Sequence, residues 1–158
     1  MSRRQAPGAL GQHPPAPDPT APTHAHGPFQ ELVGYEILAG ETGPVFRLPV
    51  RRDHLNPHGV VHGGVLMTLL DAAGGRCLVD APVPGTGDVI LSSVTASLTS
   101  EFALAVREGT LFANATPDHI GKLLAFVRMR VCLDAVDGPL VARGVATFRI
   151  YTRSLVQP

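Results

Sequence analysis

The 158-residue sequence contains no tryptophan, and aromatic residues make up only 5% of it. Aromatic rings are the platforms on which bases and sugars stack, so their scarcity argues against a protein that binds nucleic acid or sugar by stacking. Neither sign of charge is in excess, with 13 basic and 13 acidic residues. A chain without a basic block has no electrostatic attraction for nucleic acid or an anionic membrane. We therefore expect neither as a partner.

Cysteine is also scarce, and long apolar runs are missing. The two cysteines, Cys77 and Cys132, form no close pair and no metal-binding pattern, which is typical of a protein from a reducing compartment. No segment approaches the roughly 20 apolar residues of a membrane span, and the N-terminus lacks the apolar stretch of a secretion signal. We predict a soluble, cytoplasmic protein without a metal site.

The first 28 residues differ from the rest in composition. They hold seven of the 15 prolines and almost no bulky aliphatic residue. Such a segment cannot bury enough apolar surface to offset the entropy lost on ordering. We predict a disordered tail over 1–28 and one folded domain over 29–158, a length that suits a single core.

The folded part reads as two short strands, one helix and then longer strands. Turn-rich residues separate apolar runs at 33–39 and 45–50, and helical spacing of leucines and alanines marks 64–80 as the one helix. Further strands are predicted at 89–102, 110–115, 123–133 and 140–151. One helix against five or six antiparallel strands is an α+β arrangement with the helix on the concave face of the sheet.

The start of the predicted helix is the first candidate for chemistry. The unpaired N–H groups of a helix N-terminus favour a carbonyl oxygen that develops negative charge, and Gly63 and Gly64 would allow it to approach the backbone. Asn56, seven positions before Gly63, adds a side-chain amide donor. Taken singly, each motif has an ordinary alternative: His62-Gly63-Gly64 as a tight entry turn, and Asn56 before a proline as a turn starter.

Asp71 is the second candidate. It is the only acid between Asp53 and Asp80, and it stands among leucine, methionine and alanine in the middle of the helix. A carboxylate at a buried position is rarely kept without a use. The alternative is a solvent-facing position shared with Thr68 and Gly75, which lie on the same side of a helix.

The spacing of these two candidates sets a geometric condition. Eight residues of helix separate Gly63 from Asp71 by about 12 Å, whereas both groups must come within about 3 to 4 Å of one carbonyl centre to act on it. A single helix cannot satisfy that condition, but two antiparallel helices related by a two-fold axis can. We therefore hypothesise a homodimer with two composite sites.

Together these residues resemble the hotdog-fold acyl-CoA thioesterases of the phenylacetic-acid-degradation (PaaI-like) type. The pattern consists of Asn56, Gly59, His62-Gly63-Gly64 and Asp71. The likeness extends over 46–150 and includes the alternating strand 93–102, the turn at 121–122 and the ending at 138–144. It implies a central helix wrapped by an antiparallel sheet, homodimers often paired into tetramers, and hydrolysis of acyl-CoA thioesters without a cofactor.

The resemblance also implies roles for individual residues. Asn56 and the N–H of Gly63 would hold the thioester carbonyl, and Asp71 of the partner subunit would act as nucleophile or as general base on water. His62 would orient the turn rather than exchange protons. Ser93 falls where the family often has a serine or threonine that positions water near the carboxylate, with Ser92 and Thr95 one and two residues away as alternatives.

Substrate contacts are expected from three further residues: Gly64, Gly121 and Lys122. For the CoA phosphates, Lys122 and the arginines Arg107, Arg128 and Arg130 are candidates, because the nucleotide end lies outside the acyl tunnel. The alternative for each of these cations is an ordinary solvated charge.

Two other functions remain open from the sequence. A hotdog hydratase or dehydratase needs a histidine and an acid as a pair, and His62 and Asp71 are both present, although the family signatures of those enzymes are missing. A non-catalytic acyl-CoA-binding module would keep the pocket without a useful carboxylate, and Asp71 argues against it.

Overall fold

The computed structural model describes residues 27–154, so residues 1–26 of the predicted tail lie outside the described part. Its elements follow the chain in this order: α1 (Pro28–Val33), β1 (Glu36–Gly40), β2 (Gly43–Pro49), the short 3-10 helix η1 (Arg52–His54), α2 (Gly63–Arg76), β3 (Asp88–Phe102), β4 (Thr110–Ile120), β5 (Leu124–Leu133) and β6 (Leu140–Ser154).

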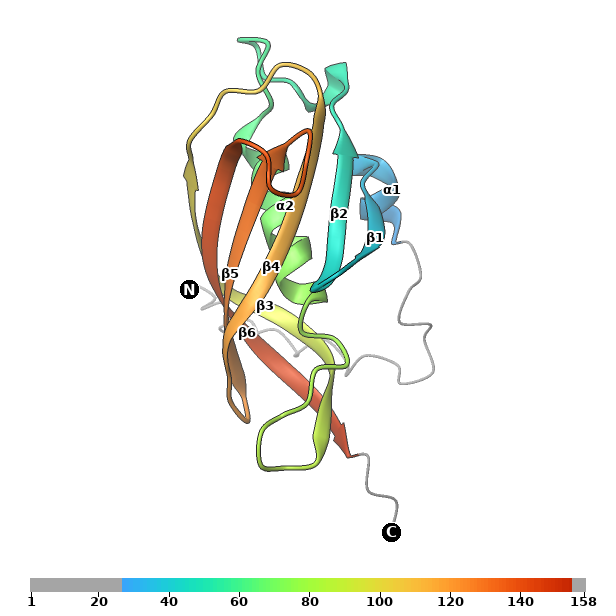
Figure 1. Ribbon diagram of the computed structural model, residues 1–158, viewed down its shortest axis with the longest axis vertical. Coiled ribbons are helices and arrows are strands. Elements are labelled where there is room, and N and C mark those ends of the chain that lie inside the picture. Colours follow the sequence, from blue (N-terminus) through green and yellow to red (C-terminus); the bar gives the residue numbers. More distant parts are fainter. Residues whose placement is uncertain (1–26, 155–158) are drawn as a thin grey trace, which may run out of the picture.

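The six strands form one antiparallel sheet in the order β1-β2-β4-β5-β6-β3, and the sheet curves around α2 (Figure 1). The predicted α+β class, with one long helix against five or six strands, is confirmed. β3 and β1 are the two edge strands of this sheet. β3 is fifteen residues long and pairs along its length with β6.

Side chains of β5 alternate between the two faces of the sheet, as expected for a strand covered on one side. The buried set packs with α2 into the core: Ala125, Val127, Met129 and Val131. The exposed set faces outward: Leu124, Phe126, Arg128 and Arg130. We call these two sides the inner face, which holds α2, and the outer face.

The short helix α1 was not predicted, and the first strand begins later than expected. Pro28 stands in its first turn, and Gly34 ends it in the left-handed conformation with φ 83°. Proline at the start and glycine just after the end are a known helix signature that the apolar pattern at 33–39 obscured. Pro28 therefore belongs to the folded part rather than to the tail.

Two other boundaries differ from the prediction by four residues or more. α2 ends at Arg76 rather than at residue 80. β4 continues to Ile120, well past the predicted end at 115. Pro117 interrupted the strand pattern in the sequence, but the register shift between Pro117 and His119 accommodates it within the ladder with β5.

Gly74 explains why α2 tolerates two consecutive glycines. A Cβ at this position would lie 2.6 Å from Met129 Sδ and 2.8 Å from Phe148, so the helix reaches the sheet only because that atom is missing. At Gly75 the same atom would lie 3.4 Å from Ser93 Oγ and 3.6 Å from Phe148, which is ordinary contact. Close packing of the helix against the sheet therefore requires glycine at position 74. It does not require glycine at position 75.

Alanine substitutions at these two positions should have opposite effects. Gly74→Ala is expected to lower the free energy of unfolding by about 1–3 kcal/mol through overpacking. Gly75→Ala should leave it unchanged or raise it by up to about 1 kcal/mol, because alanine favours a helix. Urea unfolding of both variants measures the difference. A Gly74→Ala protein as stable as the parent would contradict the packing explanation.

Candidate active site

A small turn before α2 brings Asn56 back toward the start of the helix. Leu55 and Val61 form an isolated antiparallel bridge, and the N–H of Asn56 donates to the Val60 carbonyl at 2.8 Å. Gly59 closes the turn at φ 70°, and its N–H donates to the Asn56 carbonyl at 2.9 Å. The predicted pair of donors, Asn56 and the helix N-terminus, therefore belongs to one compact loop.

Hydrogen bonds within this loop leave two donors unused. His62 Nδ1 accepts from the Gly64 N–H at 2.9 Å and caps the helix, which makes His62 a structural group here. Asn56 Oδ1 accepts from the His58 N–H at 2.9 Å. Within residues 27–154, the N–H of Gly63 and Nδ2 of Asn56 have no partner. Both can donate to an incoming carbonyl oxygen.

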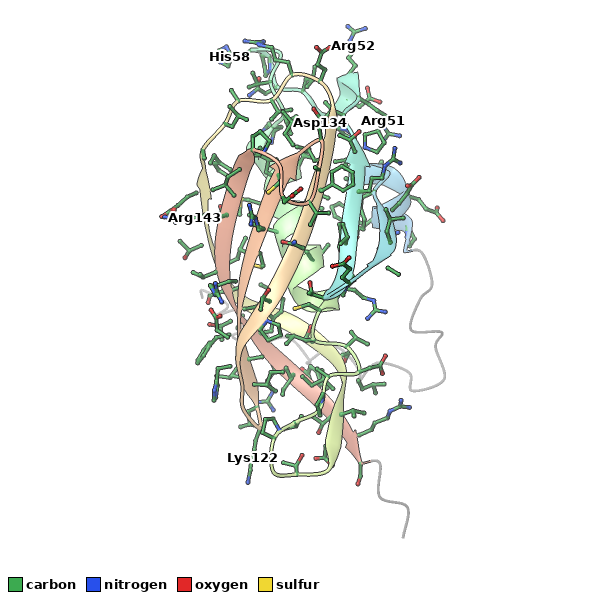
Figure 2. All side chains as sticks on the ribbon, in the orientation of Figure 1. Arg51, Arg52, His58, Lys122, Asp134 and Arg143 are labelled. Carbon is green, nitrogen blue, oxygen red and sulfur yellow. The ribbon has the colours of Figure 1, made fainter. Side chains whose placement is uncertain are left out.

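Arg107 lies in the connection between β3 and β4 and holds the same loop by hydrogen bonds. Its Nη1 donates to the carbonyls of His58 at 3.0 Å and Gly59 at 3.1 Å. The Val61 N–H donates to the Val106 carbonyl at 2.8 Å beside it. Arg107 is thus engaged with the loop that carries Asn56 and is not a free cation for phosphate. Figure 2 shows His58 at one end of the molecule, where this loop lies.

Asp71 is half-buried in the middle of α2 and is held by β3. The hydroxyl of Thr95 donates to Asp71 Oδ1 at 2.5 Å. The Ser93 hydroxyl instead donates to the Gly75 carbonyl at 3.3 Å, one turn farther along the helix. The resemblance implied that Ser93 lies beside the carboxylate. Within one protomer, the hydroxyl in that position is instead that of Thr95.

Asp71 lies in a cavity of about 610 Å³ between α1, α2 and β3. Its lining is mostly apolar: Phe29, Tyr35, Met67, Thr68, Asp71, Ala72, Thr95 and Leu98. Phe29 and Tyr35 went unnoticed in the sequence because α1 was not predicted. Thr68 shares the side of Asp71, as the solvent-facing alternative had it, and both residues line this hollow, which is open to solvent on one side.

Tyr35 adds a phenol hydroxyl to the polar groups of this cavity. Burial, and to a lesser degree the negative charge of Asp71, raises the pKa of its phenol above the ordinary value. The ring packs against Phe46 with 5.3 Å between centroids. Tyr35 therefore stays protonated at neutral pH and presents a hydroxyl donor near the carboxylate.

One protomer does not bring the two halves of the site together. Asp71 lines the cavity, whereas neither Asn56 nor Gly63 does. Both donors belong to the loop before α2, and Asp71 follows Gly63 by two turns of unbroken helix. The geometry leaves a carboxylate without its donors and donors without a carboxylate.

The predicted substrate contacts Gly121 and Lys122 lie in the turn between β4 and β5. Gly121 donates its N–H to the Leu124 carbonyl at 2.9 Å. Figure 2 shows Lys122 at the end of the molecule opposite His58. Within one chain these residues are remote from the loop of Asn56, and Gly64, the third predicted contact, has its N–H bound to His62.

Two features of the described part of the chain concern metal binding and thiol chemistry. No group of three or more metal-ligating side chains occurs among residues 27–154. Burial raises the pKa of the Cys77 thiol to about 12, and its Sγ donates to the Gly74 carbonyl at 3.1 Å, so Cys77 is no thiolate nucleophile. None of the described helices is long and apolar enough to cross a bilayer.

Comparisons with known proteins bear on what this arrangement does. The family model of the thioesterase superfamily matches residues 58–136. A Deinococcus radiodurans protein named "Putative esterase" is 34% identical over 115 residues, which cover 68% of this chain and 73% of that protein. A similarly named Thermoplasma acidophilum protein is 24% identical and covers 78% of this chain and 88% of its own length.

Solved structures give the same picture. A Bacillus halodurans protein solved with CoA has a TM-score of 0.67 and 31% identity, and the match covers 80% of this chain and 79% of that one. The E. coli PaaI protein from the phenylacetic acid degradation operon has a TM-score of 0.60. At 21% identity, with 78% of this chain and 83% of PaaI covered, the second likeness concerns the fold alone.

Proposed function

Because this chain belongs to the thioesterase superfamily, we propose that it hydrolyses acyl-CoA thioesters to a free carboxylic acid and CoA. The predicted thioesterase family and the α+β hotdog fold are confirmed. The observation that carries the proposal is a half-buried carboxylate, Asp71, in an apolar cavity. Such a cavity suits an acyl chain, and its single acid suits attack on the carbonyl at the end of that chain.

The proposal requires two subunits, and the edge strand β3 supports a means of joining them. Among the described residues, β6 is the one named strand that pairs with β3, and residues 80–83 bond only to its start at 88–90. From residue 91 on, the other edge of β3 therefore presents unpaired backbone groups. Antiparallel pairing of two β3 edges about a two-fold axis satisfies these groups and continues the sheet. It also sets two α2 helices antiparallel. We propose a homodimer of this kind, with pairing of dimers left open.

In the dimer, the substrate carbonyl oxygen is held by Asn56 Nδ2 and the Gly63 N–H of one subunit. Both donors are free in the protomer, and the helix N-terminus adds its positive field. Negative charge gathers on this oxygen when the carbonyl carbon becomes tetrahedral. Donors fixed in place beforehand stabilise that charge without having to reorganise.

Asp71 of the other subunit supplies the attack by one of two routes. As a nucleophile, its carboxylate adds to the carbonyl carbon, the C–S bond breaks, CoA leaves, and water then hydrolyses the mixed anhydride. As a general base, it takes a proton from water while the oxygen of that water adds to the carbon, and the proton passes to the departing thiolate. In both routes no cofactor takes part.

The decisive experiment measures thiol release from acyl-CoA esters by the purified protein. We expect turnover of at least one ester in a series of short, long and aromatic acyl groups. A series is needed because the cavity does not identify the acyl group of the substrate. No thiol release from the whole series would contradict the proposal.

The two free cysteines are typical of a reducing compartment, which supports the cytoplasm as the place of action.

Thr95 is expected to matter more for catalysis than Ser93. Thr95→Val removes the hydroxyl that donates to Asp71 and keeps the shape of the side chain, so kcat should fall by about 10-fold or more. Ser93→Ala removes only the bond to the Gly75 carbonyl, and kcat should change by less than about threefold. Steady-state kinetics of both variants decide the order. A larger loss in Ser93→Ala would restore Ser93 as the residue that serves the carboxylate.

A further inference from the structure

The outer face of the sheet carries a row of polar side chains that the thioesterase site does not use. Directly paired positions run across four strands, from Asn114 on β4 through Arg130 on β5 and Arg143 on β6 to Glu101 on β3. Arg128 lies two residues before Arg130 on the same face. Since their neighbours Val127 and Met129 are buried toward α2, these arginines face away from the Asp71 cavity.

The arginines of this row outnumber the carboxylates that pair with them. Arg143 forms an ion pair with Glu101, and Arg128 pairs with Asp118 at 2.5 Å. Arg130 has no partner among residues 27–154, although it stands directly opposite Arg143 on the next strand. Like charges at directly opposite positions destabilise a sheet unless something offsets them. Arg130 is therefore the arginine of this row whose charge no described carboxylate neutralises.

A groove of about 450 Å³ lies over this row. Its lining includes three arginines, one carboxylate that is paired with Arg143, and hydrogen-bonding and apolar groups: Arg128, Arg130, Arg143, Glu101, Asn114, Thr99 and Val145. A neighbouring hollow shares Thr99 and Val145 and adds the exposed ring of Phe126. Several donors thus converge on one spot, with an apolar surface beside it.

We propose that this groove binds a phosphate-bearing small molecule, with Arg130 as the central contact. The guanidinium offers a planar fork of N–H groups that fits two oxygens of a phosphate, and Asn114 and Thr99 offer donors for the others. A phosphate group has enough oxygens to use them all, whereas a carboxylate has two. The organic part of the ligand lies on Val145 and Phe126.

Titration calorimetry with inorganic pyrophosphate at constant ionic strength tests this site. We expect binding to the parent protein and a dissociation constant at least about tenfold higher in Arg130→Gln. Arg153→Gln serves as the control, because it removes another exposed cation, one that pairs with Asp80 on another part of the molecule, and it should bind as the parent does. No binding to the parent, or equal loss in both variants, would overturn the proposal.

The source of the phosphate is decided in a second arm with the acyl-CoA substrate. If the ligand is a separate molecule, Arg130→Gln should leave KM and kcat for thioester hydrolysis unchanged while pyrophosphate binding is lost. If the nucleotide end of CoA is the ligand, KM should rise by a similar factor and pyrophosphate should compete with the substrate. Because pyrophosphate binding is measured without turnover, a failure of the thioesterase proposal does not affect the first arm.

Discussion

Asp71→Asn is expected to lower thioester hydrolysis by a factor of about 10³ or more, because an amide neither attacks a carbonyl nor takes a proton from water. The asparagine oxygen can still accept the hydrogen bond from Thr95, so the fold and the cavity should be kept. Thiol release measures the loss, and circular dichroism with size-exclusion chromatography checks folding and assembly.

Asp80→Asn is the matched control for this change. Asp80 has φ 65°, a conformation that asparagine also tolerates, and it is exposed just beyond α2. Its activity should equal that of the parent. If Asp71→Asn retained full activity, the carboxylate would have no part in the chemistry, and both proposed routes of attack would be wrong.

Gly63→Pro should lower kcat by about 10²-fold to 10³-fold, because it deletes the backbone N–H proposed to hold the carbonyl oxygen. Proline is well suited to the first position of a helix, and His62 before it already has the extended conformation (φ −64°, ψ 136°) that proline requires. The substitution therefore removes one donor with little effect on the backbone.

Gly63→Ala separates the donor from the side chain. It keeps the N–H and adds a Cβ that would meet the Phe102 ring at 3.4 Å, an ordinary contact. Its activity should stay within a few-fold of the parent. Equal losses in the proline and alanine variants would mean that crowding near Phe102, and not the missing donor, is responsible.

Mixing the two inactive variants tests whether the site is shared between subunits. In a heterodimer of Asp71→Ala and Gly63→Pro chains, one composite site contains both lesions and the other contains neither. Refolded mixtures should therefore recover up to half of the parent activity per heterodimer. Verified heterodimers without activity would show that Asp71 and Gly63 do not meet across the two-fold axis.

Much of the fold followed from local pattern. The helix of α2 and the strands β5 and β6 were predictable because their apolar residues recur at one period over a long stretch. A tight turn at His62-Gly63-Gly64 before α2 was predictable from the motif, whereas the capping bond from the Gly64 N–H to His62 Nδ1 was not. β4 beyond residue 115 was not, because Pro117 is a signal against a strand that only the paired structure overrides.

The hydroxyl beside Asp71 shows why the rest was out of reach. Ser93 and Thr95 lie on the same side of β3, and register shifts at residues 90–92 and 95–97 change how the strand advances along α2. A shift of this kind does not change the apolar pattern of the strand. The sequence therefore does not tell which of the two hydroxyls lies beside Asp71. The cavity wall from α1 was missed for a different reason, since six residues are too few to display a helical period.

Arg107 holds the donor loop by the carbonyls of His58 and Gly59 and not by any side chain. The loop can therefore exchange the side chain at position 58 without losing its anchor, whereas Arg107 itself has no equivalent among shorter or uncharged residues. Variation among homologous chains should accordingly concentrate at position 58. The residue that fixes the geometry stands almost fifty positions away in the sequence, outside the motif that it holds.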